Sequence, residues 1–136
     1  MGNGSLILLD THALVWWATE PRNLSPRARK AAQTAAADGE LAASAMSLFE
    51  IATLLRRGRL SFTVQADRWF LALTSLPELN IEPISPEIAW DAGHRDASFP
   101  GDPADRIIAA TARALNARLV TADEKLRAAL GESALW

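Results

Sequence analysis

The sequence lacks cysteine entirely, so it can form neither a disulfide nor a zinc site with thiolate ligands. Histidine is scarce, with two residues in the chain. A long hydrophobic run is also missing, because the first apolar stretch ends at Asp10 and no basic segment precedes it. We therefore expect neither a signal peptide nor a membrane-spanning helix, and a cytoplasmic location.

The sequence also lacks an excess of positive charge, with 14 Lys and Arg against 16 Asp and Glu and a formal net charge of -2. Domains that bind nucleic acid through overall charge are normally basic, so any such binding here requires a local site. The composition, 49% hydrophobic and 22% charged, is typical of a globular protein. A length of 136 residues without a linker or repeat predicts a single domain over residues 1–136.

Short apolar segments alternate with helical patterns along the chain. The expected strands are 6–9, 41–44, 79–84 and 118–121. The expected helices are 11–19, 26–37, 47–57, 64–76, 86–92, 103–115 and 124–130. Because helices separate the strands by more than a hairpin allows, we predict an α/β fold in three layers. Its centre would be a mainly parallel sheet of four to five short strands flanked by helices.

Four carboxylates lie next to predicted helix starts, and they are Asp10, Glu50, Asp105 and Asp123. In a parallel sheet, a helix that follows a strand begins at the carboxyl end of that strand. Ligands of open α/β sheets bind outside the same ends. We therefore expect all four side chains to share one edge of the sheet.

Helix capping offers a simpler explanation of these acids. Residues 47–50 fit a capping box, with Ser47 as the N-cap and Glu50 reaching back to it. Asp102 and Asp105 have the same spacing, with Pro103 at the first helical position. Asp10 and Asp123 would then be simple N-caps.

Capping does not require charge, and the predicted caps Ser25 and Ser85 open two other helices without it. Four converging carboxylates would raise one another's pKa values unless a cation neutralised them. An all-oxygen ligand set fits Mg²⁺ or Mn²⁺ better than zinc. A metal bound in this way can activate water for attack on a phosphodiester, so the pattern is compatible with a nuclease on an acidic chain.

Two other functions fit the same residues. The first is an aspartyl phosphotransferase or phosphatase phosphorylated on Asp10, although that class commonly places a second acid where this chain has His12. The second is a non-catalytic RNA- or protein-binding module in which the acids only cap helices. A phosphoenzyme trapped on Asp10, with no cleavage of RNA, would favour the first. Metal-dependent RNA cleavage that Asp10→Asn or Asp105→Asn abolishes, with folding intact, would exclude the second.

Four segments, 8–17, 47–52, 102–112 and 119–123, together resemble the PIN domain, and in particular the VapC-type toxins of bacterial toxin–antitoxin pairs. The resemblance implies a PIN-like fold and an endoribonuclease that depends on Mg²⁺ or Mn²⁺. It also implies a homodimer inhibited by a small antitoxin protein, whose C-terminal segment lies across the active site. An Arg or Lys of that segment would pair with the carboxylates that hold the metal.

The same resemblance assigns Asp10, Glu50, Asp105 and Asp123 to the acidic quartet of the family. Asp105 matches the third acid because Arg106 follows it directly, and Asp102 would cap the helix or assist. Thr11 and Thr121 match hydroxyl positions that orient ligands or waters. The RNA sequence that is cut, the roles of His12 and His94, and the role of the arginines at 56, 57 and 59 stay open.

Overall fold

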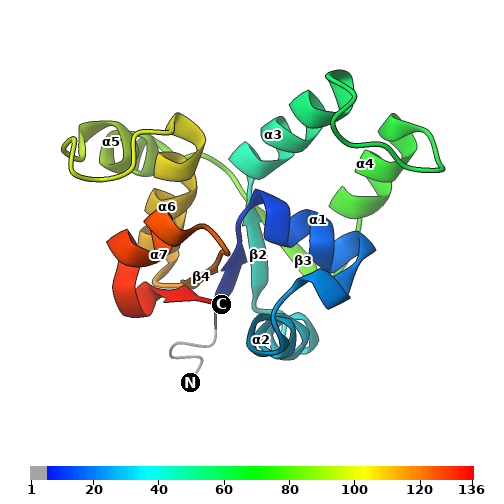
Figure 1. Cartoon of the computed structure of the whole chain (residues 1–136), viewed down its shortest axis with the longest axis horizontal. Helices are drawn as coiled ribbons and strands as arrows, with labels where there is room; N and C mark the ends of the chain where they lie inside the picture. The colour runs from blue at the N-terminus through cyan, green and yellow to red at the C-terminus, as the bar shows by residue number, and fades with distance from the viewer. Residues whose placement is uncertain (1–5) are drawn as a thin grey trace.

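The computed structural model describes residues 6–136, and its centre is a sheet of five parallel strands (Figure 1). The strands are β1 (Ile7–Leu9), β2 (Leu41–Ser44), β3 (Leu79–Glu82), β4 (Arg118–Val120) and β5 (Ala134–Leu135). Their order is β3-β2-β1-β4-β5, and every neighbouring pair is parallel. The predicted parallel sheet is therefore confirmed, while the prediction of a strand over 79–84 extends two residues too far.

Seven α-helices belong to the described part of the chain. They are α1 (Thr11–Thr19), α2 (Pro26–Ala37), α3 (Ala45–Arg56), α4 (Ala66–Thr74), α5 (Pro86–His94), α6 (Pro103–Leu115) and α7 (Glu124–Leu130). Two 3₁₀ turns, Pro21–Asn23 and Gly131–Ser133, follow α1 and α7. None of these helices has the length and hydrophobicity needed to cross a bilayer.

The predicted helix starts are confirmed at Ser25 and Ser85, whose hydroxyl oxygens accept backbone hydrogen bonds from the first turns of α2 and α5. The predicted cap at Ser47 is wrong. Helix α3 begins at Ala45 and is capped by Ser44, whose hydroxyl oxygen accepts from Met46 N at 3.0 Å. The last residue of β2 thus serves as the cap, because no loop separates this strand from its helix. The predicted range 64–76 for α4 is also too long, since α4 spans Ala66–Thr74.

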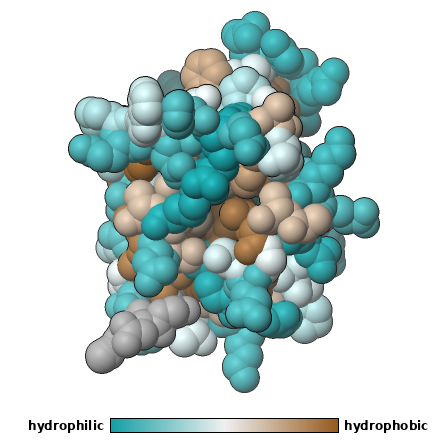
Figure 2. Space-filling view, turned by 90° about the vertical axis from the view of Figure 1, so that its left-hand side faces the viewer, coloured by the Kyte–Doolittle hydropathy of each residue, from teal (hydrophilic) through white to brown (hydrophobic). Residues whose placement is uncertain are grey.

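Helices cover both faces of the sheet because alternate strand residues point in opposite directions. Ile7 and Leu9 pack in one apolar cluster with residues of α1, α2, α3 and α4. Leu8 packs in another with residues of α6 and α7. Helix α5 lies outside this second layer and packs on α6 through Ile88 and Ala92. The side formed by α5–α7 carries mostly hydrophilic side chains, with some apolar surface between them (Figure 2).

The topology brings the starts of four helices to the carboxyl edge of the sheet. Helices α1, α3 and α7 directly follow β1, β2 and β4, so they begin at that edge. Helix α6 precedes β4 and runs back toward its start, turning at Asn116 with a φ of 52°. Its N-terminus therefore also lies at the carboxyl edge, between α3 and α7 (Figure 1).

Candidate active site

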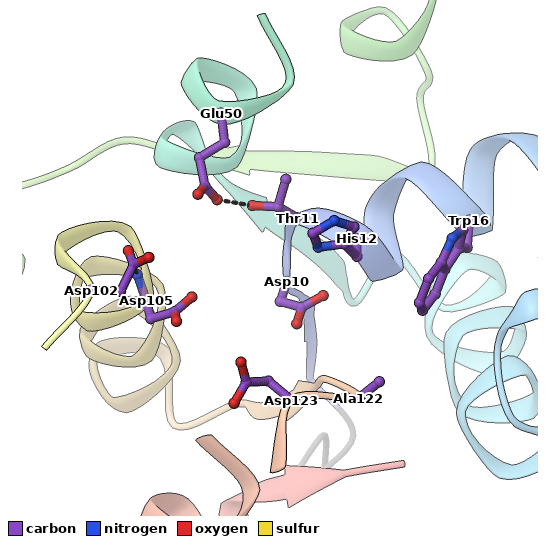
Figure 3. A pocket seen from close by; sticks show the side chains of 9 residues that line it. All are labelled: Asp10, Thr11, His12, Trp16, Glu50, Asp102, Asp105, Ala122 and Asp123. Carbon is purple, nitrogen blue, oxygen red and sulfur yellow. Dashed lines mark hydrogen bonds between the residues drawn. The ribbon is translucent and has the colours of Figure 1, made fainter. Parts of the chain in front are cut away.

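A cavity of about 430 Å³ opens at the carboxyl edge of the sheet (Figure 3). We call it the acidic cavity, and it is lined by Asp10, Thr11, His12, Trp16, Glu50, Asp102, Asp105, Ala122 and Asp123. All four carboxylates expected at this edge line it, although they come from three helix starts and the second turn of α3. The structure thus brings together residues that are up to 113 positions apart.

Asp10 is the most buried carboxylate of the cavity, with 9% of its surface exposed. It caps α1, and its Oδ1 atom accepts a hydrogen bond from Ala13 N at 2.8 Å. The hydroxyl of Thr121 at the end of β4 also hydrogen-bonds to it. Burial raises the pKa of Asp10, and this effect outweighs the opposing influence of its two hydrogen bonds and of His12.

Glu50 is held by the hydroxyl of Thr11, which is itself bonded to Ser47, and the predicted capping box does not form. The Thr11 hydroxyl donates a short hydrogen bond to Glu50 Oε1. Thr11 Oγ1 and Ser47 Oγ share a second hydrogen bond at 3.0 Å. Because the one proton of Thr11 serves the carboxylate, Ser47 provides the proton of this second bond. Burial raises the pKa of Glu50, against the lowering effect of the Thr11 hydrogen bond.

Asp102 and Asp105 open α6 in the predicted manner. Asp102 Oδ1 accepts hydrogen bonds from Ala104 N at 2.9 Å and from Asp105 N at 3.3 Å. Asp105, one turn into the helix, is free of such a role: within residues 6–136 its carboxylate accepts no hydrogen bond and forms no salt bridge. Its side chain points into the acidic cavity (Figure 3).

The pKa of Asp105 shows most clearly that the acids of the cavity lie close together. Burial, followed by the negative charges of Asp102, Asp123, Glu50 and Asp10, raises the pKa of Asp105 from its ordinary value of 3.8 to about 7. No Lys or Arg of residues 6–136 forms a salt bridge with any of these five acids. The cavity therefore holds uncompensated negative charge whenever Asp105 is ionised.

Asp123 is exposed and caps α7, where its Oδ1 accepts from Lys125 N at 2.8 Å and from Leu126 N at 3.0 Å. Its own backbone N–H donates to Thr121 Oγ1 at 3.1 Å. Thr121, which is fully buried, therefore contacts two of the four acids. This hydroxyl links Asp10 to the start of α7.

The donor set of the acidic cavity fits a hard divalent cation, because carboxylate and hydroxyl oxygens are the ligands that Mg²⁺ and Mn²⁺ prefer. A cation would also neutralise the repulsion that raises the pKa of Asp105. As the side chains lie, no three acidic or histidine groups of residues 6–136 form a closed metal-binding set. Mg²⁺ commonly keeps several waters and takes one or two direct carboxylates, so a closed set is not required.

Three residues of this site had no predicted role there. Ser47 supports Thr11 from inside α3, while His12 and Trp16 line the cavity from α1. His12 and Trp16 are four residues apart, which places them on one face of a helix, and their ring centroids are 6.0 Å apart. His94, whose role the sequence left open, lies outside this cavity, and its exposed ring stacks on Trp90 with ring centroids 4.4 Å apart.

Comparison with known proteins identifies a matching family, a relative in sequence and similar solved structures. The PIN domain family matches residues 7–130. The chain is 40% identical over 121 residues to Ribonuclease VapC22 of Mycobacterium tuberculosis (strain ATCC 25618 / H37Rv), covering 89% of each chain. Its fold is similar to a chain of a toxin-antitoxin complex from Klebsiella pneumoniae, with a TM-score of 0.66, 23% identity and 96% coverage of both chains. It is also similar to a chain of VapBC2 from Rickettsia felis bound to a promoter DNA fragment, with a TM-score of 0.65, 18% identity and coverage of 90% and 92%.

Proposed function

The chain belongs to the PIN-domain family, and from this premise we propose that it is a metal-dependent endoribonuclease that acts as the toxin of a toxin–antitoxin pair. The observation that carries the proposal is the convergence of Asp10, Glu50, Asp105 and Asp123 on one cavity that no Lys or Arg of residues 6–136 lines. The relative that is 40% identical is a ribonuclease by name. The bond that is cleaved in this proposal is therefore a phosphodiester of RNA.

In this proposal, the four acids hold Mg²⁺ or Mn²⁺, which when bound lowers the pKa of water and neutralises phosphate charge. Thr11 keeps Glu50 turned toward the acidic cavity, and Thr121 does the same for Asp10. Asp102 assists by fixing the first turn of α6, on which Asp105 stands. Asp105, whose pKa is raised to about 7, is partly protonated at neutral pH, and a cation or other positive group entering the cavity would favour its ionised form.

As a toxin, the protein would be inhibited by a small antitoxin protein. A small antitoxin would insert an Arg or Lys side chain among the same carboxylates, since a cationic side chain relieves their repulsion as a metal does. We also propose that the protein acts as a homodimer in the cytoplasm, where its RNA substrate is found. We further propose that the chain over residues 1–136 carries a single PIN-like domain.

Purified protein freed of any antitoxin tests this function. We expect it to cut RNA with Mg²⁺ or Mn²⁺ and to leave RNA intact in EDTA. Asp10→Asn and Asp105→Asn should each lower the cleavage rate at least about 100-fold. A matched control, Asp38→Asn, removes an exposed carboxylate beside the opposite edge of the sheet and should retain full activity. Intact RNA with both metals, or full activity in Asp10→Asn, would contradict the proposal, and a phosphoryl adduct on Asp10 would favour a phosphotransferase instead.

A further inference from the structure

Trp16 borders two cavities at once. Besides the acidic cavity, it lines a larger one of about 770 Å³, which we call the aromatic cavity. The other residues of the aromatic cavity are Val15, Thr19, Glu20, Asn23, Leu60, Ser61, Phe62, Thr63, Val64 and Trp69. Volumes of about 300–1,000 Å³ are usual for cavities that bind small molecules or parts of larger ligands. The indole of Trp16 is therefore the boundary between the acids and a second site.

The aromatic cavity is built between α1, the segment before α4 and the first turn of α4. Phe62 stacks on Trp69, with ring centroids 4.1 Å apart and an interplanar angle of 17°. Trp16 packs against Trp136, with ring centroids 5.9 Å apart and an interplanar angle of 52°. These contacts fix the rings, so the cavity wall is already shaped before a ligand arrives.

His12 continues the aromatic surface toward the acids. It lies one helical turn before Trp16 and its ring is exposed. Figure 3 shows His12 beside Asp10, with Trp16 following along α1 away from the carboxylates. A ligand that has one group at the acids and extends along α1 would pass over His12 and then over Trp16.

The charge of the two cavities differs. Aspartate and glutamate dominate the acidic cavity, whereas the only charged residue lining the aromatic cavity in the described chain is Glu20, which forms a salt bridge with Arg22 at 3.0 Å. Nothing in that lining attracts a phosphate. A flat, uncharged, π-rich group fits it better, and among the parts of RNA only the nucleobase has that character.

Given the proposed ribonuclease function, we propose that a nucleobase next to the scissile phosphodiester stacks on Trp16 and enters the aromatic cavity, with the tilted ring of His12 beside it. The substrate is single-stranded at this position, because a paired base is stacked within its own helix and cannot reach a protein ring. Trp16 and His12 are thus residues that position the substrate and select the base, apart from the acids that act on the phosphodiester.

A binding experiment without cleavage tests the stacking itself. All proteins carry Asp105→Asn so that the RNA stays intact, and the probes are a labelled single-stranded RNA of random sequence and an abasic oligomer of equal length. Stacking on one aromatic side chain contributes about 1–3 kcal/mol, so Trp16→Leu should lower affinity for the base-bearing probe about 5- to 150-fold. Trp16→Phe should retain most of the affinity, and the abasic probe should bind both variants equally.

The chain supplies a matched control. Trp90 and His94 on α5 repeat the same pair of residues at the same spacing, with Trp90 67% exposed, but they lie outside both cavities. Trp90→Leu should leave the affinity for both probes unchanged. Equal losses in Trp16→Leu and Trp90→Leu, or an equal loss for both probes in Trp16→Leu, would overturn the proposal. His12→Ala, which removes an exposed ring, provides the same test if Trp16→Leu does not fold.

A cleavage experiment separates this proposal from the proposed function. Proteins with Asp105 intact digest a pool of single-stranded RNA with a randomised centre, and the new ends are sequenced. Trp16→Leu and His12→Ala should change the base preference at one position beside the cut, whereas a purely structural defect would lower all cleavage alike. If the wild type cuts no RNA, the proposed ribonuclease function is wrong. The binding experiment still tests whether a base stacks on Trp16. Unchanged affinity and unchanged base preference in Trp16→Leu would overturn the proposal.

Discussion

The hydroxyl of Thr11 donates a hydrogen bond to the carboxylate of Glu50, a residue 39 positions further along the chain. This bond connects the first turn of α1 to the second turn of α3 across the acidic cavity. Glu50 does not fold back to cap its own helix, because α3 begins at Ala45 and is capped by Ser44, which leaves Glu50 in the second turn. One hydroxyl thus determines where the carboxylate of Glu50 points.

Replacing Thr11 by valine should impair catalysis because it removes this hydroxyl while keeping the shape of the side chain. Removing a group that orients a metal ligand typically costs about 10- to 100-fold in activity or metal affinity, and we expect a loss of that size in kcat and in Mg²⁺ affinity. Thr11→Ser retains the hydroxyl and should retain most activity. Steady-state cleavage rates over a Mg²⁺ titration measure both quantities.

Thr53→Val is the matched control for this substitution. Its hydroxyl lies on α3 and donates only to Phe49 O, at 3.0 Å, away from the acids. Activity should be unchanged in that variant. If Thr11→Val were as active as Thr53→Val, the Thr11–Glu50 bond would have no part in arranging the site.

Much of the site could be predicted because its parts are local in sequence. A short apolar strand followed by Asp10, and the Asp102–Pro103 pair at a helix start, each carry a capping signal that the structure confirms. The parallel topology then brings these starts to one edge. The position of Asp10, Asp105 and Asp123 around one cavity follows from these two facts, whereas Glu50 reaches it from the second turn of α3. The role of the four acids as metal ligands stays a prediction.

The remaining features depend on contacts between distant segments. The pairing of Thr11 with Ser47 spans 36 positions, and no local pattern around Ser47 indicates it. Strand β5 has two residues, too few to show a period, and pairs with β4 only through Leu119 and Val120. The double role of Trp16 likewise depends on the segment 60–64, which reaches α1 only in the fold.

Asp105→Asn should stabilise the metal-free protein at neutral and higher pH. Burial and neighbouring acids raise the pKa of Asp105 from 3.8 to about 7, so between these values the folded state holds a proton that the unfolded state has lost. The free energy of unfolding therefore falls as pH rises from about 4 to about 7. Because Asp105 is only half buried, solvent screening reduces the effect, and we expect a gain of about 1–3 kcal/mol at pH 8.

Urea denaturation of wild type and Asp105→Asn from pH 4 to pH 8, in EDTA, measures this gain. The two curves should meet near pH 4 and diverge as pH rises. Asp91→Asn is a control of opposite sign: despite its burial, hydrogen bonds from Arg113 and Arg95 lower the pKa of Asp91, so its contribution to stability is present above about pH 4. That variant should be less stable than wild type at pH 8. A wild type as stable as Asp105→Asn at pH 8 would refute the raised pKa of Asp105.

Divalent metal should stabilise the protein more at pH 8 than at pH 6. Asp105, whose pKa is raised to about 7 by burial and by the acids around it, must lose its proton before it can bind a cation. Metal binding thus releases a proton at pH 6 and little or none at pH 8. At a Mg²⁺ concentration of about 100 times its Kd, the stabilisation reaches about 2.7 kcal/mol.

Thermal unfolding with and without Mg²⁺ at the two pH values measures this linkage. In Asp105→Asn the metal effect should be small and should no longer depend on pH in this range. Addition of EDTA should return wild-type protein to its metal-free Tm. A metal shift that is equal at both pH values would show that Asp105 does not exchange its proton for the cation.

Arg106→Lys should loosen the segment that leads into the acidic end of α6. Although Arg106 directly follows Asp105, its guanidinium does not reach the acids. Its Nε atom donates to Ala92 O at 2.8 Å, and its Nη atoms donate to backbone carbonyls between residues 95 and 100. Lysine lacks the planar group that serves several carbonyls at once, so we expect a loss of about 1–3 kcal/mol in the free energy of unfolding.

Hydrogen exchange locates this effect. Amides of residues 95–101 should exchange faster in Arg106→Lys, because the carbonyls that Arg106 binds hold this segment against α6. Arg68→Lys, an exposed position on α4, should change neither stability nor exchange. Since the segment leads directly to Asp102, faster exchange should be accompanied by slower cleavage at low Mg²⁺. Unchanged exchange over 95–101 would mean that other contacts, such as the packing of Phe99, are sufficient to hold the segment.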